Sequence, residues 1–372
     1  MFCRECGKEL SESENFCNKC GARRPEKLIP DPIVEEQPKK EGFSKLFKLF
    51  KVRHESENEN AIISLQFKLE KTCECAESIR TIAMSPNGKY FVTGHSKDGG
   101  LTIWDASTFK EVKDLCSDRI ISVAFSPDSN YIVASDSFIE KKLFSETRSY
   151  YINVYAIKSG EGIIGLDCGS HNGFCDSLSF SPNGKRIVGI RGGTPRLWNA
   201  KDGQQLLEFP KEAEKIIFHP KENKLISFYN DVISIWDEDS AEEIEKIVSK
   251  GDSTSTANFK SIVFSANGQY LAAGTNCGKI FIWNFKNLEC IKGLQVADGN
   301  EELYSISFNP RLNNVVAFST NESIKIWDMK GEKEIKKLSL ENSFWVSFTP
   351  DGKSLLAESG KKVIEWSVTK EM

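Results

Sequence analysis

One sequence motif recurs seven times between residue 61 and the end of the chain. Each copy has an alternating apolar run, a turn rich in Pro, Asn or Asp, and Gly, a second apolar run, a short polar turn, and a third run that ends in an aromatic residue. The first run and its turn occupy Ile82–Gly88, Val123–Asp128, Leu178–Gly184, Ile216–Pro220, Ile262–Gly268, Ile306–Pro310 and Val346–Gly352. Because alternation of period two indicates half-buried strands, the repeats predict an all-β array in which each unit packs on its neighbours.

The third run of each copy is as regular as the first. Successive closing aromatics lie 38 to 51 residues apart, at Trp104, Tyr155, Trp198, Trp236, Trp283, Trp327 and Trp366. In the turns, Pro fixes the entry and Gly takes a positive φ angle. We expect the aromatic side chains to pack between neighbouring sheets.

These motifs resemble the WD-repeat family, whose units of ~40–45 residues each form a four-stranded blade. The resemblance implies that residues 61–372 form a seven-bladed β-propeller. It also implies that an N-terminal strand, here Ala61 to Leu69, completes the last blade and so removes an exposed edge.

The sequence departs from the family in two respects. The family links a His, a Ser or Thr, an Asp and the Trp by hydrogen bonds, but only His171 stands at the His position, and Asp98 and Asp231 are candidates for the turn Asp. We therefore expect these blades to depend on apolar packing. A charged insertion near Ser137 to Ser149 is expected to form a loop that contacts a partner or is merely tolerated.

Four cysteines near the N-terminus form a candidate metal site. Two Cys-x-x-Cys-Gly motifs supply Cys3, Cys6, Cys17 and Cys20, which is the closed thiolate set of a structural zinc site. Residues 1–24 resemble a short zinc ribbon, and metal would supply the folding energy that so short a segment lacks. A redox dithiol or a disulfide pair does not explain two matching motifs. Iron in a rubredoxin-like site is the alternative to zinc.

Residues 25–60 are predicted to form a flexible linker, because prolines stand among charges and Glu55 to Asn60 is wholly polar. Within it, the basic segment 43–53 places Phe43, Leu46, Phe47 and Phe50 on one face at helical spacing. This segment packs on the propeller or stays partly ordered, docks into a protein partner, or makes a weak peripheral contact with an anionic membrane.

Composition narrows the class of protein. The net charge of -4 gives no global attraction to nucleic acid, and no stretch approaches the ~20 apolar residues of a membrane helix. The first residues show no apolar signal segment, which predicts a cytoplasmic protein. We find no catalytic motif and expect no enzymatic activity. Cys168, His171 and Cys175 have a spacing that suits a second metal site, but the resemblance assigns His171 a structural role.

The rim where the first strands begin is the predicted interaction surface of the propeller. The aligned positions hold Arg80, Ile121, Asp176, Glu214, Lys260, Tyr304 and Phe344. Such a mixture of charges and aromatics is typical of interaction surfaces, although an ordinary solvated rim would look similar.

The sequence therefore favours a non-enzymatic scaffold or adaptor that binds a protein partner through the propeller and carries one structural zinc ion. An alternative is nucleic-acid binding through the ribbon, whose Arg4, Lys8, Lys19, Arg23 and Arg24 are nearly offset by Glu5, Glu9, Glu12 and Glu14. A propeller enzyme is the third hypothesis, and it lacks a catalytic constellation.

Overall fold

The structure is a computed structural model that describes residues 64–96, 99–142, 145–166, 175–248, 257–298 and 301–370, with backbone alone for 138–142 and 145–149. The ribbon of residues 1–24, with Cys3, Cys6, Cys17 and Cys20, and the linker of residues 25–60 lie outside this range. Within the described ranges, every regular element is a strand. None of these residues belongs to a helix that could span a membrane.

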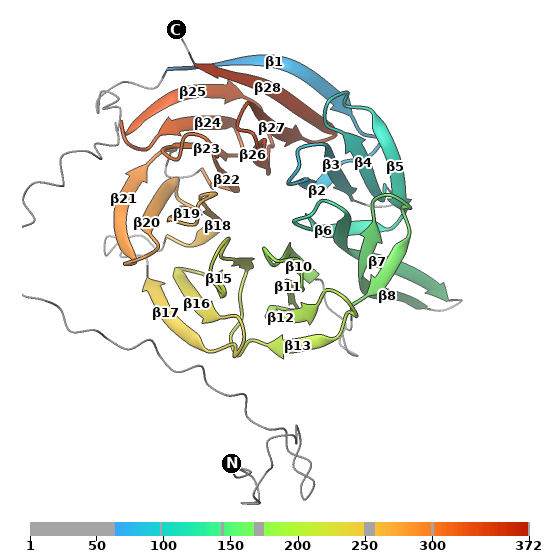
Figure 1. Cartoon of the computed structure of the whole chain (residues 1–372). Coiled ribbons are helices and arrows are strands. Elements are labelled where there is room, and N and C mark those ends of the chain that lie inside the picture. The colour runs from blue at the N-terminus through green and yellow to red at the C-terminus, as the bar shows by residue number, and fades with distance from the viewer. Residues whose placement is uncertain are drawn as a thin grey trace, which may run out of the picture. The chain divides into compact units, whose positions relative to one another are not determined.

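In the described part of the chain, the strands form seven four-stranded antiparallel sheets that stand as blades around a ring (Figure 1). Blade 1 contains β2 (Ile79–Met84), β3 (Tyr90–His95), β4 (Leu101–Asp105) and β5 (Glu111–Cys116). Blade 2 contains β6 (Arg119–Phe125), β7 (Tyr131–Lys142), β8 (Ser145–Ala156) and β9 (Gly162–Gly165). Blade 3 contains β10 (Cys175–Phe180), β11 (Arg186–Arg191), β12 (Thr194–Asn199) and β13 (Gln205–Glu208).

The remaining blades repeat the same order. Blade 4 contains β14 (Lys215–Phe218), β15 (Lys224–Tyr229), β16 (Val232–Asp237) and β17 (Glu243–Val248). Blade 5 contains β18 (Phe259–Phe264), β19 (Tyr270–Thr275), β20 (Lys279–Asn284) and β21 (Glu289–Gln295). Blade 6 contains β22 (Ser305–Phe308), β23 (Val315–Ser319), β24 (Ser323–Asp328) and β25 (Lys333–Ser339). Blade 7 contains β26 (Val346–Phe348), β27 (Ser354–Ser359), β28 (Lys362–Lys370) and, as its outer strand, β1 (Leu65–Glu74).

The ring closes as the repeats predict. Strand β1 runs antiparallel to β28, with Leu65 opposite Lys370 and Glu74 opposite Lys362 (Figure 1). The first described strand therefore completes the last blade, and it continues five residues beyond Leu69, where the sequence pattern ended. Because this pairing covers the outer edge of β28, the two ends of the propeller hold each other in place.

The apolar core lies between neighbouring blades. Between blades 1 and 2, for example, Ile103 of β4, Ile120 of β6 and Ile132 of β7 are wholly buried in one cluster. Burying an aliphatic side chain of this size contributes ~1.5–3 kcal/mol. The predicted packing of the closing aromatics between sheets is confirmed: all are buried except Trp327, which packs partly buried on the cluster between blades 5 and 6.

In five of the seven blades, the turn between the first and second strands contains a residue in the left-handed conformation. Gly88, Gly184, Gly268 and Gly352 take φ angles of 64° to 75° there. In blade 2, Ser129 adopts the same conformation with φ of 59°. Glycine has no Cβ that would clash at a positive φ angle, which explains why these copies of the motif end in Gly.

The insertion in the second repeat is a lengthened hairpin, so the expectation of a loop near Ser137 to Ser149 is wrong. Strands β7 and β8 keep one continuous register as far as Lys142 opposite Ser145, and the pair extends away from the ring (Figure 1). The inner neighbour β6 pairs with β7 no further than Ser137. The outer part of the hairpin is therefore a two-stranded ribbon.

Candidate interaction face

The six predicted partner-contact residues lie on the same face of the ring, where the first strands of the blades begin. Each stands at or just before the start of the first strand of its blade, and all blades share one strand order. These residues, which we call the rim set, are Arg80, Asp176, Glu214, Lys260, Tyr304 and Phe344. Ile121, at the aligned position of blade 2, is buried and adds nothing to this surface.

Two aromatic members of the rim set touch across a blade boundary. The rings of Tyr304 in blade 6 and Phe344 in blade 7 meet edge to face, with centroids 4.9 Å apart and an interplanar angle of 69°. Phe344 is 54% exposed although it is a large apolar side chain. An aromatic pair that is packed on one side and open to solvent on the other has the character of a binding hot spot.

The charged members of the rim set interact with charged or polar groups nearby. Lys260 forms an ion pair with Glu302, with the Nζ and Oε1 atoms 3.6 Å apart. Burial raises the pKa of the Asp176 carboxyl, and the charge of Arg80 opposes that rise. Glu214 accepts a hydrogen bond from the backbone N–H of Asn230 at 3.3 Å. Because three of these charges are balanced locally, the rim has no strong field of one sign.

A buried carboxyl group lies behind Phe344 and was missed by the sequence analysis. Glu358 is 4% exposed, and its Oε1 atom accepts a hydrogen bond from the backbone N–H of Phe344, with N and Oε1 2.6 Å apart. Burial raises the pKa of this carboxyl to about 7, against the opposing effect of its backbone donors. A glutamate directly after the apolar run Leu355–Ala357 was the available signal. Glu358 fixes the backbone that presents Phe344.

Polar contacts inside two blades add to the apolar packing that the sequence predicts. In blade 1, the indole Nε1 of Trp104 donates to Thr93 Oγ1 at 2.8 Å, and that hydroxyl lies 2.9 Å from Nε2 of His95. In blade 4, Trp236 Nε1 donates to Ser227 Oγ at 2.8 Å. The histidine of blade 1 thus comes from the second strand and not from the family position.

Blade 2 has a polar contact of a third kind. Asp136, which is buried, accepts hydrogen bonds from Asn153 Nδ2 at 3.0 Å and from the hydroxyl of Tyr155 at 3.5 Å. Burial raises the pKa of Asp136 to about 6. Asp98 and His171, singled out from the sequence, lie outside the described residues.

The proposed metal ligands are not tested by the described residues, which start at Ser64. Among the residues that the structure describes, no cluster of three or more His, Cys, Asp or Glu side chains could hold a metal ion. Cys168 and His171 are outside this part, while Cys175 is buried in the core between blades 2 and 3.

Family models match segments in both parts of the chain, the propeller and the N-terminal cysteine motifs. A family model described as a WD domain, G-beta repeat, matches residues 67–105, 110–139 and 250–284. A zinc-ribbon domain model matches residues 2–23. The described residues thus form a seven-bladed β-propeller with WD-repeat matches in three segments, and residues 2–23 match a zinc-ribbon domain.

The similar proteins are distant. Retinoblastoma-binding-like protein E of Dictyostelium discoideum is 23% identical over 303 residues, which is 74% of this chain and 55% of that protein. A guanine nucleotide-binding protein subunit beta-like protein of Encephalitozoon cuniculi is 25% identical over 190 residues, 44% of this chain and 55% of that protein. Polycomb protein esc of Drosophila melanogaster is 26% identical over 117 residues, 31% of this chain and 27% of that protein. The chain spans about half the length, or less, of these relatives.

Proposed function

We propose that this protein is a non-enzymatic scaffold that binds a protein partner through the rim set of its propeller. The observation that carries the proposal is the contact between Tyr304 and Phe344, because it leaves an exposed aromatic side chain fixed at a blade boundary. The names of two similar proteins describe one as binding-like and the other as subunit-like, which supports an interaction role for this propeller. The cytoplasm is the compartment that we propose for this function.

The ribbon has a separate role in this proposal. Its donor set of Cys3, Cys6, Cys17 and Cys20 fits one zinc ion held by four thiolates, and the zinc-ribbon match supports this assignment. A closed set leaves no open position for a substrate, so the ion would serve folding.

The proposal is tested by affinity capture with the full chain and quantitative comparison of the captured proteins. Phe344→Ala should reduce capture of a specific partner at least fivefold, because a truncated hot spot costs more than 1 kcal/mol. Tyr131→Ala is the matched control, since Tyr131 is a 39% exposed aromatic at the opposite ends of the strands. Equal recovery of every protein by both variants would contradict the proposal. Salt-sensitive capture of RNA or DNA that depends on Cys17 and Cys20 would favour nucleic-acid binding instead.

A further inference from the structure

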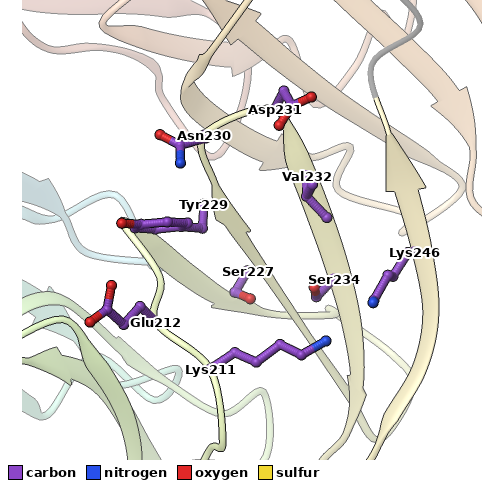
Figure 2. Close-up of a pocket in the computed structure, with 9 residues that line it drawn as sticks. All are labelled: Lys211, Glu212, Ser227, Tyr229, Asn230, Asp231, Val232, Ser234 and Lys246. Atoms are coloured by element: carbon purple, nitrogen blue, oxygen red, sulfur yellow. The ribbon is translucent and has the colours of Figure 1, made fainter.

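A cleft of about 450 Å³ opens on blade 4, between the β13–β14 connection and the face of the blade (Figure 2). Its floor is one cross-strand row in which Ser227 of β15 pairs with Ser234 of β16, and Ser234 pairs with Lys246 of β17. Paired residues in antiparallel strands point to the same face, so these three side chains lie side by side. Lys211 and Glu212 from the connection form the opposite wall.

One part of the cleft carries a net positive charge. Lys211 and Lys246 both pair with Oε2 of Glu243, at 2.5 and 3.3 Å. The other oxygen of Glu243 accepts a hydrogen bond from Ser234 at 2.7 Å. Two ammonium groups thus share one carboxylate, and each is about half exposed, with side chains 45% and 50% accessible. Each ammonium has three N–H donors, so both can donate to a further acceptor.

A buried hydroxyl donor adjoins these ammonium groups. The Ser227 hydroxyl, in a residue that is 2% exposed, accepts a hydrogen bond from the indole N–H of Trp236. Among the described residues it has no acceptor for its own proton. The equivalent hydroxyl of blade 1, Thr93, contacts His95 in addition to its tryptophan. In blade 4 the position equivalent to His95 holds Tyr229, for which the described residues show no hydrogen bond to Ser227. The Ser227 hydroxyl lines the cleft and is available to donate into it (Figure 2).

Another part of the cleft is acidic and aromatic. Tyr229 is 44% exposed, and the nearby Glu212 carboxylate raises the pKa of its hydroxyl. Asp231 lies beyond Tyr229, away from the Lys211 ammonium (Figure 2). This part favours N–H donors, such as those of a peptide backbone, beside an anion bound at the lysines.

We propose that this cleft binds a carboxylate side chain of a partner polypeptide, with Ser227, Lys211 and Lys246 as donors to the carboxylate oxygens. The inference rests on the proposed function in taking a polypeptide as the partner. A monoanion suits the site better than a phosphate dianion, because Glu243, Glu212 and Asp231 outnumber the two lysines. Backbone N–H groups next to the carboxylate then meet Glu212 and Tyr229.

The test is titration of the full-length protein with blocked tripeptides, followed by ligand-detected NMR. The acetyl-Ala-Glu-Ala-amide peptide should bind, and its glutamine analogue should bind roughly three- to tenfold more weakly, as expected for loss of a charge-assisted hydrogen bond. Lys211→Ala and Lys246→Ala should each weaken binding of the glutamate peptide by a similar factor.

A matched control lies on the same blade. Lys224 has an ion pair with Glu222 at 2.7 Å and stands over the Phe285 ring at 5.5 Å, much as Lys211 stands over Trp236 at 5.9 Å. Lys224→Ala should leave peptide binding unchanged. The inference is overturned by equal binding of the glutamine peptide, by equal loss in the control, or by tighter binding of a phosphoserine peptide. If the glutamate peptide fails to bind while Phe344→Ala still reduces partner capture at least fivefold, the cleft proposal fails and the scaffold proposal stands.

Discussion

Single buried carboxyl groups make the stability of this propeller depend on pH. The Glu358 carboxyl is enclosed behind the exposed Phe344, and burial holds its pKa at about 7. In the unfolded chain the same group ionises near its ordinary value of 4.5. As pH rises between these values, the unfolded chain loses its proton first, so the folded state becomes less stable across this window.

We predict that Glu358→Gln removes a large part of this pH dependence. The wild-type free energy of unfolding should fall by roughly 3 kcal/mol because of this group as pH rises from about 4.5 to 7. The variant should lack that decrease, while it keeps the smaller decrease due to Asp136, whose pKa is raised in the same direction. Urea unfolding at pH 5 and pH 8 measures the difference. Identical pH dependence in the two proteins would show that Glu358 is not buried as described.

The hydrogen-bonded chain in blade 1 is a second feature at the residue scale. Thr93→Val leaves the indole N–H of Trp104 buried without an acceptor, which should cost about 1–3 kcal/mol of unfolding free energy. A double-mutant cycle with Trp104→Phe isolates this contact, since the second change removes the donor. The expected coupling energy is about 1 kcal/mol. Strict additivity of the two substitutions would rule out the hydrogen bond as a source of stability.

At the scale of elements, the strand β1 decides whether the ring is closed. Its pairing with β28 covers a long edge, from Leu65 opposite Lys370 to Glu74 opposite Lys362. Without β1, blade 7 would keep its other strands but expose the edge of β28, which is a template for pairing with another chain.

We therefore predict that deletion of residues 1–74 lowers the melting temperature and promotes association between chains. Deletion of residues 1–59 is the control, because it leaves the whole of β1 in place. Differential scanning calorimetry and light scattering measure the two effects. A monomeric 1–74 deletion with an unchanged melting temperature would contradict the closure role of β1.

The sequence predicted the blades better than the contacts within them. Turn chemistry and alternation are local signals, so the seven units and the closing strand could be recognised without a structure. The role of His95 depends on register, because Thr93 meets Trp104 only when Phe91 pairs with Trp104 across β3 and β4. A hydroxyl residue two positions beyond the residue paired with the tryptophan would have been the signal, and Ser227 beyond Leu225 repeats it in blade 4.

The hairpin of blade 2 was missed for a different reason. Apart from Leu143 and Phe144, the residues from Glu140 to Ser149 carry charges or hydroxyls, whereas a buried strand would show apolar alternation. Beyond Ser137, β7 no longer pairs with β6, so this part of the hairpin need not follow the alternation of a strand with one buried face. Backbone pairing between β7 and β8 was therefore not visible in the sequence.

At the scale of the whole molecule, the ribbon and the propeller are predicted to act as independent parts. Metal analysis should find near one zinc ion per chain, and Cys17→Ser with Cys20→Ser should abolish it. The melting temperature of the propeller should stay within a few degrees, since its core is built from blade contacts. Metal-free native protein would contradict the zinc assignment. A large decrease in the melting temperature would show that the two parts depend on each other.

The central claim is that the rim set forms the surface that binds a protein partner. Hydrogen–deuterium exchange of the full chain, alone and in the complex recovered by affinity capture, tests it most directly. We predict that binding slows exchange in the segments around Tyr304 and Phe344, and leaves the turns at Gly88, Gly184 and Gly268, at the other end of the strands, unchanged. Protection confined to those turns, with none at Tyr304 and Phe344, would contradict the account.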